Sequence, residues 1–327
     1  MYRSVTIPVL ISAIAVILFI SLLLLNNSNL IITPQSRITS QSIQDYSIVA
    51  VGDFGCNNNT DKVMTLINSL KPNLILGLGD YSYTTSIDCW LKELNNNKID
   101  TNKVKLALGN HEYGSTKCLT YANYCLTDQE RDKLMKRFNI PYEGYYSFNY
   151  NNAHILVMNT EVPYAKDSKQ YNFVVNDLSN TSKNSRINWI IVAFHEPMYS
   201  SPSAHTVLLD LRSIYQPIFD KYSVDLVLQG HTHAYERSKP VKYNEVVTDN
   251  SLYVYNNPNG EIFVTIGTGG APLYRYTEKL PYSATQTSIH GVLEIRIRDN
   301  GSLLEARFIS IDGNILDTFS IKKNLNK

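Results

Sequence analysis

Five apolar segments of this chain each run directly into a residue type that binds metal ions. The segments are short runs rich in Val, Ile, Leu and Ala at residues 47–52, 74–79, 104–109, 190–194 and 226–230. The residues that follow them are, in chain order, Asp53, Asp80, Asn110-His111, His195 and His231-Thr232-His233. Such runs are typical of buried strands, and open α/β sheets bind ligands at the carboxyl ends of their strands. The sequence therefore predicts two aspartates, an asparagine and several histidines at one edge of a sheet.

Segments that can be helical alternate with these runs, at residues 60–70, 128–138, 170–178 and 206–222. This alternation favours α/β layers. Nearer the carboxyl terminus, apolar runs at 261–267, 291–298, 303–311 and 316–322 follow one another, the last three across the turn sequences Asp299-Asn300-Gly301 and Asp312-Gly313-Asn314. With 327 residues the chain can bury a full core. We expect a four-layer α/β/β/α sandwich of two mixed sheets, with helices on the outer faces.

The amino terminus has a different character. Residues 5–25 carry no ionisable side chain, and a helix needs about 20 apolar residues to cross a bilayer. Arg3 is the only charged side chain before them, which favours a cytoplasmic tail and export of the rest. We expect residues 1–25 to be a transmembrane anchor. A cleaved secretory signal is the alternative, although the stretch is long for a signal core and no clear small-x-small site follows.

The remainder divides into two parts. Residues 26–45 are rich in Asn, Ser, Thr and Gln, the composition of a flexible stalk, and residues 46–327 are expected to form the catalytic domain. The formal net charge is +1 and no long Lys/Arg run occurs, so the composition gives no reason to expect nucleic-acid binding.

The chain has 4 cysteines, and export to an oxidising compartment favours disulfides. Cys118 and Cys125 are close enough in sequence to staple a loop. Cys56 and Cys89 each follow a strand end that carries a ligand, so they lie near each other if those strands are neighbours. We predict the pairs Cys118–Cys125 and Cys56–Cys89. Neither pair has a zinc-finger spacing.

The residue types at the strand ends favour a pair of metal ions. Carboxylate, amide oxygen and imidazole suit hard to borderline cations, and a shared carboxylate can bridge two of them. Two ions roughly 3.5–4 Å apart form the clamp used by phosphatases and nucleases. One Gly-Asp after a strand is usually just a turn, but packing alone does not explain five strand ends in this order. The pattern therefore predicts a metal-dependent hydrolase.

The same blocks resemble the purple acid phosphatases, within the calcineurin-like metallophosphoesterases. Five blocks carry the resemblance, which spans residues 46–319: Gly52-Asp53-Phe54-Gly55, Gly79-Asp80-Tyr81-Ser82-Tyr83, Gly109-Asn110-His111-Glu112, Val192-Ala193-Phe194-His195 and Gly230-His231-Thr232-His233. The resemblance implies a short form of the family without an N-terminal fibronectin-like domain. It also implies an acid phosphatase with two unlike metal ions.

Seven metal ligands are implied by this resemblance. One set, for Fe(III), is Asp53, Asp80, Tyr83 and His233. The other set, for divalent Zn, Mn or Fe, is Asp80, Asn110, His195 and His231, with Asp80 bridging. Tyr83 distinguishes this subfamily, because a phenol with a pKa near 10 is a poor ligand at neutral pH unless the metal is strongly Lewis acidic. An ordinary half-buried loop aromatic is the alternative for Tyr83.

The family reaction is hydrolysis of a phosphate monoester by in-line attack of a metal-bound hydroxide. By resemblance, His111 faces the substrate and donates to the phosphoryl group or to the leaving alkoxide. His205 stands where the family has a substrate histidine, and its neighbour Ala204 replaces a second histidine of several members. Glu112 is expected to orient His111 or to lie solvated at the surface. The block 267–270 brings main chain close to the site or forms a plain tight turn.

Other functions stay open at this point. A phosphodiesterase or nucleotidase can use the same fold, although Tyr83 argues against it. An inactive surface protein that binds phosphate or a partner should have lost a ligand, and none is missing. Iron-dependent radical chemistry stays open as a side activity. We expect a small phosphate ester as substrate and contact with a membrane through the N-terminal helix. The catalytic domain is expected outside the cytoplasm, anchored, or secreted if the N-terminal segment is cleaved.

Overall fold

A computed structural model describes residues 43–114, 124–247 and 251–325. The predicted anchor, most of the predicted stalk and Cys118 lie outside these ranges. Within the described ranges, no helix combines the length and the apolar character that crossing a membrane requires. The described residues belong to one compact unit that begins at Ile43.

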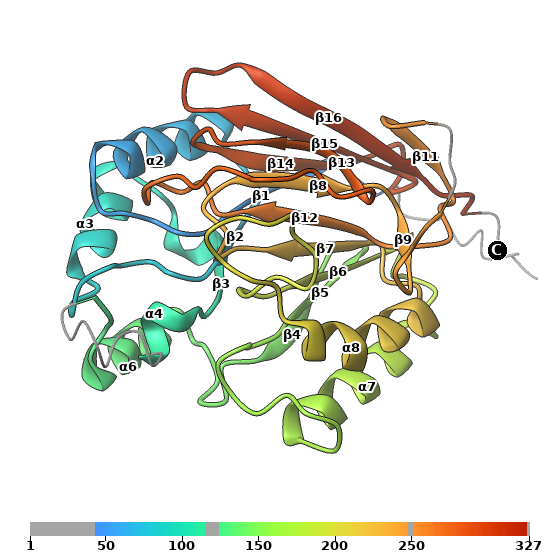
Figure 1. The fold of residues 1–327 in the computed structure, drawn as a ribbon, viewed down its shortest axis with the longest axis horizontal. Helices are drawn as coiled ribbons and strands as arrows, with labels where there is room; N and C mark the ends of the chain where they lie inside the picture. Colours follow the sequence, from blue (N-terminus) through green and yellow to red (C-terminus); the bar gives the residue numbers. More distant parts are fainter. Residues whose placement is uncertain (1–42, 115–123, 248–250, 326–327) are drawn as a thin grey trace, which may run out of the picture. The chain divides into compact units, whose positions relative to one another are not determined.

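Two seven-stranded sheets form the centre of this unit (Figure 1). The first, sheet A, has the order β11-β16-β15-β14-β1-β2-β3, and sheet B has the order β13-β8-β12-β7-β6-β5-β4. The strands of sheet A are β1 (Tyr46–Val51), β2 (Leu74–Leu78), β3 (Val104–Ala107), β11 (Val254–Asn256), β14 (Gly291–Arg298), β15 (Leu303–Ser310) and β16 (Ile315–Lys322). Those of sheet B are β4 (Tyr146–Tyr150), β5 (Ala153–Val157), β6 (Trp189–Ala193), β7 (Leu226–Gln229), β8 (Tyr235–Ser238), β12 (Ile262–Ile266) and β13 (Ser283–Thr287). A separate two-stranded ribbon pairs β9 (Val241–Lys242) with β10 (Glu245–Val246).

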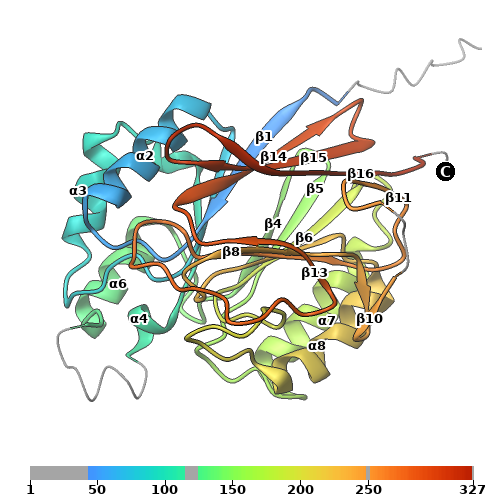
Figure 2. The ribbon, with the colours of Figure 1, turned by 45° about the horizontal axis from the view of Figure 1, so that its top comes forward.

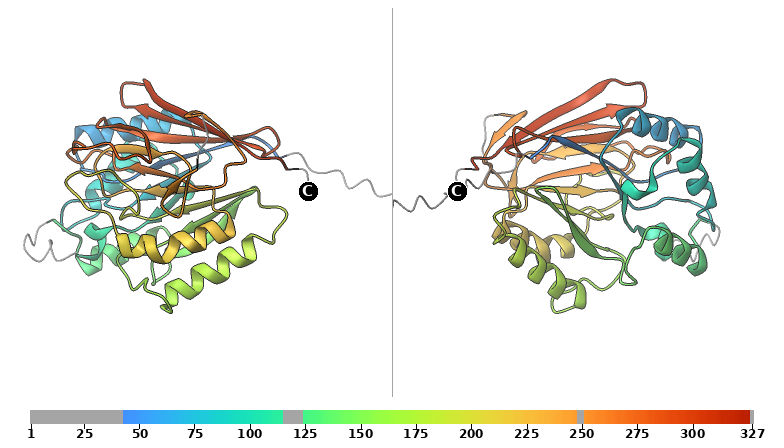
Figure 3. Two further views of the ribbon diagram at one scale, coloured as in Figure 1. Left: turned by 45° about the vertical axis from the view of Figure 1, so that its right-hand side comes forward. Right: turned by 180° about the vertical axis from the view of Figure 1, so that it is seen from behind.

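Helices flank the two sheets, which lie one above the other with α7 and α8 below sheet B (Figure 2). The helices are α2 (Asn58–Leu70), α3 (Asp88–Asn96), α4 (Asn110–Tyr113), α6 (Asp128–Arg137), α7 (Lys169–Thr181) and α8 (Leu209–Tyr222), with a 3₁₀ turn η1 (Thr101–Lys103). In both views of Figure 3, α7 and α8 run side by side on the same face. The predicted fold of two mixed sheets with flanking helices is confirmed.

Alternating side chains of sheet B build two cores. Ile155, Ile191 and Leu228 point to the core shared with sheet A, whereas Leu156, Val192 and Val227 pack with residues of α7 and α8. The strand period of two residues produces this division. Because both faces are covered, β5, β6 and β7 are buried at every residue, as expected for parallel strands.

The outer face of β14 and β15 carries charged side chains. Glu294 is 1% exposed and forms ion pairs with Arg296 and Arg307, and Arg298 pairs with Glu305 nearby. An antiparallel sheet can leave one face to water when that face is polar. The helical cover of sheet A reaches β14 through α2, but it is less complete than the cover over β5 to β7.

Parallel pairing brings the ligand-bearing strand ends to one edge. β1 pairs with β2 and β2 with β3 in sheet A, and β6 pairs with β7 in sheet B, all parallel. The Gly52 amide donates to the Ile266 carbonyl at 2.9 Å, which joins the end of β1 to the end of β12 across the two sheets. The carboxyl ends of the ligand-bearing strands of both sheets therefore meet at one place.

The predicted disulfide between Cys56 and Cys89 is present. Cys56 follows β1 and Cys89 lies in the first turn of α3 after β2, and these two strands are neighbours. Cys125 is also disulfide-bonded, and its predicted partner Cys118 lies outside the described residues.

Candidate metal centre

All seven predicted metal ligands lie together where the strand ends meet. Six of them are buried and Tyr83 is half-buried; the buried ones are Asp53, Asp80, Asn110, His195, His231 and His233. Strand ends in sheet A supply the carboxylates and the amide, and those in sheet B supply the imidazoles. Two sheets thus contribute different ligand chemistry to one buried site.

The first group of ligand atoms surrounds the Tyr83 hydroxyl. This oxygen lies 3.4 Å from Asp53 Oδ1, 3.4 Å from Asp80 Oδ2 and 2.8 Å from His233 Nε2. His233 Nε2 is itself 3.4 Å from Asp53 Oδ1. These are the four residues assigned by resemblance to the trivalent ion.

The second group surrounds His195 Nε2. That nitrogen lies 3.2 Å from Asp80 Oδ2, 3.0 Å from Asn110 Oδ1 and 3.1 Å from His231 Nδ1. Ligand atoms of Asp80, His195 and His231 all lie within 4.8 Å of one another. Asp80 Oδ2 faces both groups, so the predicted bridging residue stands between them.

Three of the ligands have left-handed main-chain conformations. The φ angles are 63° at Asp53, 55° at Asp80 and 65° at His231. Such residues cost on the order of 1–3 kcal/mol each and persist only where neighbouring contacts hold them. Here the His231 amide donates to Asp53 Oδ2 at 2.9 Å, and the His111 amide donates to Asp80 Oδ1 at 3.0 Å. The ligand loops therefore hold one another in place.

Glu112 fixes two of these loops. Its carboxylate accepts hydrogen bonds from the main-chain amides of Asp80, Tyr81 and Gly109 at 2.8–2.9 Å. Burial, followed by the charge of Asp80, raises the pKa of Glu112 to about 8. The expectation that Glu112 orients the His111 ring, or is solvated, is wrong. The carboxyl group is fully buried, and it accepts hydrogen bonds from main-chain amides next to Asp80 and Asn110.

The glycine-rich block at residues 267–270 approaches the site closely. The Gly269 amide donates to the Gly52 carbonyl at 2.8 Å, and the Ala271 amide donates to the Asp53 carbonyl at 3.0 Å. A Cβ at Gly267 would lie 2.9 Å from Asp53 Oδ2 and 2.1 Å from the Thr232 carbonyl oxygen. Of the two interpretations, close approach of the main chain is therefore the correct one.

Carbonyl groups orient two of the imidazoles. His195 Nδ1 lies 2.7 Å from the Leu78 carbonyl oxygen, and His233 Nδ1 lies 2.9 Å from that of Pro272. A ring whose Nδ1–H donates to a carbonyl presents an unprotonated Nε2, the atom that binds metal. Both Nε2 atoms point into the ligand groups described above.

Tyr83 is held as a neutral phenol in the metal-free protein. Burial, followed by the charges of Asp53 and Asp80, raises its pKa well above the ordinary value of 10.0. A metal ion that binds the Tyr83 oxygen as phenolate would therefore have to displace this proton.

A cavity of about 500 Å³ opens over the ligands. Beside five of the predicted ligands, its lining consists of Gly55, His111, Tyr124, His205, Pro272 and Tyr274. His111 Nδ1 donates to the Tyr124 carbonyl, and His111 Nε2 lies 3.8 Å from Asp80 Oδ2. The His205 ring lies 4.0 Å from that of His231. Both predicted substrate histidines therefore line the cavity next to the ligands.

Comparison with known proteins identifies the family to which this chain belongs. The profile of the family Calcineurin-like phosphoesterase matches residues 46–235, more than half of the chain. This chain belongs to that family. Within it, purple acid phosphatase 15 of Arabidopsis thaliana is 30% identical to this phosphoesterase over 71% of this chain and 46% of that protein.

Two further relatives share the fold or the sequence of this phosphoesterase. Fe(3+)-Zn(2+) purple acid phosphatase 12 of Arabidopsis thaliana is 27% identical over 84% of this chain and 62% of that protein. The structure of purple acid phosphatase PPD1 from yellow lupin seeds superposes with a TM-score of 0.71 at 22% identity, covering 86% of this chain and 54% of that chain. The chain spans about half the length of the curated relatives it matches.

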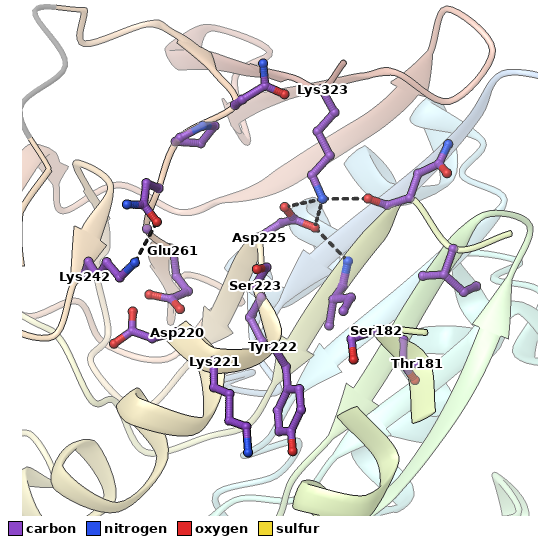
Figure 4. A pocket seen from close by; sticks show the side chains of 18 of the residues that line it. Thr181, Ser182, Asp220, Lys221, Tyr222, Ser223, Asp225, Lys242, Glu261 and Lys323 are labelled. Carbon is purple, nitrogen blue, oxygen red and sulfur yellow. Dashed lines mark hydrogen bonds and ion pairs between the residues drawn. The ribbon is translucent and has the colours of Figure 1, made fainter. Parts of the chain in front are cut away.

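A larger cavity of this phosphoesterase, about 630 Å³, lies at the opposite ends of the strands (Figure 4). Asp225 and Glu261 immediately precede β7 and β12 there. Lys323 Nζ lies 2.6 Å from Asp225 Oδ1 and donates to the Asn188 carbonyl at 2.7 Å. Lys323 therefore connects the end of β16 to the residues that precede β6 and β7. The described metal-ligand cluster lies in the smaller cavity, which makes that cavity the functional one.

Tyr274 is a site residue that the sequence analysis missed. Its ring stacks on that of His233 with centroids 4.2 Å apart and planes 8° apart, and its hydroxyl lies 3.2 Å from His205 Nε2. Tyr274 follows the glycine-rich block by four residues, and one of 23 tyrosines outside any motif gave no signal.

Proposed function

We propose that this phosphoesterase is a binuclear-metal acid phosphatase that hydrolyses phosphate monoesters. The observation that carries the proposal is the pair of ligand groups that share Asp80 Oδ2, one around Tyr83 and one around His195. Relatives named purple acid phosphatases support the same reaction class. Phosphate hydrolysis is chemistry that two neighbouring ions perform well.

The ligand chemistry fits two unlike ions. The first group, which consists of two carboxylates, an imidazole and the Tyr83 phenol, suits Fe(III), because hard oxygen ligands favour a highly charged ion. An amide oxygen and two imidazoles around His195, with the shared carboxylate, suit divalent Zn, Mn or Fe. The relative named for Fe(3+) and Zn(2+) supports such a pair. When bound, the ions would supply Lewis acidity and a water activated for attack.

His111 and His205 would handle the substrate's phosphoryl group and leaving oxygen. The Nδ1–H of His111 is bonded to the Tyr124 carbonyl, which leaves Nε2 facing Asp80 and the cavity. A protonated His111 would donate from Nε2 to a phosphoryl oxygen or to the leaving alkoxide. His205 Nε2 lies beside the Tyr274 hydroxyl in the lining of the same cavity. Both imidazoles would therefore be available to a phosphoryl group bound in this cavity.

Turnover of matched esters tests this function. The purified protein with its metals should hydrolyse p-nitrophenyl phosphate at least tenfold faster than bis(p-nitrophenyl) phosphate at acid pH, since the ligand set with Tyr83 favours the monoester class. Asp80→Asn is the control, because it removes the shared carboxylate and should abolish both rates. A preference for the diester would contradict the proposal in favour of a phosphodiesterase.

We also propose that the catalytic domain works outside the cytoplasm, tethered by residues 1–25 or released from them. The Cys56–Cys89 disulfide supports this location, because such bonds persist in oxidising compartments. The uncharged stretch at residues 5–25 supports the tether. Membrane fractionation of the full chain with protease protection should find the domain on the exported side, and a protected cytoplasmic domain would contradict it.

A further inference from the structure

The loop that carries His205 consists of residues 202–207, which belong to no helix or strand and are exposed or half-buried. Ser201, directly before this loop, is 1% exposed. From the loop the His205 ring reaches the metal ligands and the cavity wall, 4.0 Å from the His231 ring and 5.1 Å from the Tyr274 ring. The position of the His205 ring therefore depends in part on how the chain is held at Ser201.

Glu236 holds Ser201 from the side of the metal ligands. Glu236 lies on β8, three residues after the ligand His233, and is 3% exposed. Its Oε2 accepts a hydrogen bond from the Ser201 amide at 2.6 Å, and its Oε1 accepts one from Ser201 Oγ at 2.5 Å. Ser200 Oγ donates to Oε2 as well, at 3.3 Å. A contact at two points fixes the orientation of the two groups as well as their distance.

The same serine reaches the residues that follow Tyr274. The Leu280 amide donates to Ser201 Oγ at 3.2 Å, and the Tyr274 hydroxyl lies 3.2 Å from His205 Nε2. Strand β8, the His205 loop and the segment after Tyr274 are thus joined around the buried Glu236 carboxylate. Loss of this carboxylate would release the loop from the strand that follows the metal ligands.

We propose that Glu236 is a positioning residue, which holds His205 beside the metal ligands through its two hydrogen bonds to Ser201. This proposal rests on the proposed phosphatase function, in which His205 contacts the substrate. Glu236 is not among the described residues that line the cavity, so it acts through His205 rather than on the substrate. Position matters here, because a misplacement of about 1 Å near the reacting atoms can cost about 100-fold in rate.

A double-mutant cycle tests the path through His205. Glu236→Ala and His205→Ala should each lower kcat/KM for p-nitrophenyl phosphate about tenfold in the metal-loaded full chain, within the usual cost of misplacing a group near the reaction. The double variant should be at most twofold slower than His205→Ala, because the two residues act as one unit. Losses that multiply to about 100-fold would overturn the proposal, because Glu236 would then act independently of His205.

A conservative substitution separates position from charge. Glu236→Gln keeps an oxygen for the Ser201 amide and places an NH₂ group beside Ser201 Oγ, so its kcat/KM should stay within threefold of the wild type. A rate as low as that of Glu236→Ala would overturn the positioning role in favour of a need for negative charge. Ser238→Ala is the matched control and should stay within twofold. Ser238 is buried on the same strand and accepts from the Phe263 amide at 2.8 Å.

The ring signal of His205 in a ¹H–¹³C NMR spectrum reports its position without metal or turnover. In the metal-free full chain this signal is assigned by its absence in His205→Ala. Because the His231 and Tyr274 rings lie close by, a movement of the loop changes its chemical shift. Glu236→Ala should shift the signal, and Ser238→Ala should leave it in place. An unshifted signal in folded Glu236→Ala would overturn the proposal.

Ser201→Ala replaces Glu236→Ala in the cycle and in the spectrum if the latter variant does not fold. It removes the hydrogen bond to Glu236 Oε1 and keeps the one from the main-chain amide, so about a threefold loss of kcat/KM is expected. This loss should also disappear in the His205→Ala background. A loss that persists there would overturn the proposal.

Failure of this proposal differs from failure of the phosphatase function. If the wild type hydrolyses monoesters and Glu236→Ala or His205→Ala keeps the wild-type rate, only the positioning proposal fails. If the protein with two bound metals hydrolyses no monoester, the phosphatase function fails, and the NMR signal still shows whether Glu236 holds the His205 ring.

Discussion

Tyr83 lies between two carboxylates and an imidazole, an environment that disfavours its ionisation. Its hydroxyl is 3.4 Å from Asp53 Oδ1, 3.4 Å from Asp80 Oδ2 and 2.8 Å from His233 Nε2. The pKa of the phenol is raised well above 10.0, by burial and then by the two carboxylates. A divalent ion of modest acidity leaves such a phenol protonated, whereas a trivalent ion displaces the proton. The proposed preference for Fe(III) thus depends on the position of one side chain.

Tyr83→Phe tests this residue. The variant should lose the visible tyrosinate-to-iron absorption and retain less iron than the wild type, because one oxygen ligand is gone. The measurement is an absorption spectrum with elemental analysis of the same sample. Tyr81→Phe is the matched control. The Tyr81 hydroxyl donates to the Ala107 carbonyl rather than facing the ligands, so the colour should remain. Colour that survives Tyr83→Phe would show that another group supplies the charge transfer.

His111→Ala tests the assignment of a proton donor. The variant should lower kcat about 100-fold, the lower end of the range for general acid catalysis, while binding both metals. His154→Gln is the control. His154 lies on β5, forms an ion pair with Asp177 of α7 at 2.7 Å, and does not line the cavity. Its kcat should stay within twofold. Loss of metal from His111→Ala would instead make His111 part of the metal site.

At the residue scale, the sequence predicted which side chains gather at the strand ends better than it predicted the groups that support them. Strand ends showed where Asp53, Asp80 and His195 would gather, because a buried strand places the next residue at the sheet edge. Glu112 and Tyr274 were misread or missed, since their partners are main-chain groups and rings brought near by the fold. No spacing in the chain encodes the bond from the Asp80 amide to Glu112.

Elements with strong periodicity were predicted and short irregular ones were not. The helix predicted at 128–138 is α6 (Asp128–Arg137), and Thr127 caps it by accepting from the Glu130 amide. In contrast, α3 begins after Ile87, which makes no side-chain cap, and α4 is a single turn that starts at the ligand Asn110. Neither gives a capping or periodic signal long enough to recognise in sequence.

Where α8 meets β12, a buried carboxyl group lies beside a half-buried one. Glu261 is 1% exposed, accepts from Gln216 Nε2 at 2.7 Å and lies beside Asp220, with Lys242 nearby (Figure 4). Burial and then the Asp220 charge raise the pKa of Glu261 from 4.5 to about 9. The folded protein therefore holds this proton more tightly than the unfolded chain. Its stabilising effect is complete below pH 4.5 and is lost as pH rises toward 9.

Glu261→Gln should flatten this dependence. Glutamine resembles the protonated carboxyl group, so the variant should unfold at a temperature near that of the wild type at pH 5 and above it at pH 9. Thermal unfolding followed by circular dichroism across this range is the measurement. Glu278→Gln, at an exposed position, is the control and should follow the wild type throughout. A variant that loses stability in parallel with the wild type from pH 5 to 9 would refute the shared proton.

At the scale of the whole molecule, a buried ion pair joins the two sheets. Arg237 on β8 donates to both carboxylate oxygens of Asp317 on β16, at 2.6 and 2.9 Å. The Tyr235 hydroxyl donates to the same carboxylate at 2.7 Å, and Arg237 also donates to the Tyr255 hydroxyl. Arg237 is only 1% exposed, and among the described residues Asp317 supplies the counter-charge of this buried guanidinium.

Asp317→Asn should destabilise the fold by about 3–5 kcal/mol, the usual cost of leaving one partner of a buried pair without its counter-charge. Urea unfolding measures the change. Glu305→Gln is the matched control, since its pair with Arg298 is solvent-exposed and contributes at most about 1 kcal/mol. Equal effects of the two substitutions would mean that the pair between the sheets contributes no more than a surface pair.

The layer architecture was predictable from sequence, but the strand order was not. Alternation of apolar runs with helical segments predicted two sheets with flanking helices, as found. Which sheet each later strand joins depends on pairing far along the chain: β14 lies beside β1, whereas β12 lies beside β7. The edge strand β11 has 3 residues and the edge strand β13 is polar, and their pairing with β16 and β8 has no local signature.

The metal content of the purified full chain, measured with its absorption spectrum, shows whether the strand ends hold two ions around Asp80. We expect two ions per chain, one of them iron in a coloured protein, and loss of both ions in Asp80→Asn because the Asp80 carboxylate faces both ligand groups. No more than one ion at saturating metal, or two ions retained in Asp80→Asn, would contradict a binuclear centre built on a shared carboxylate.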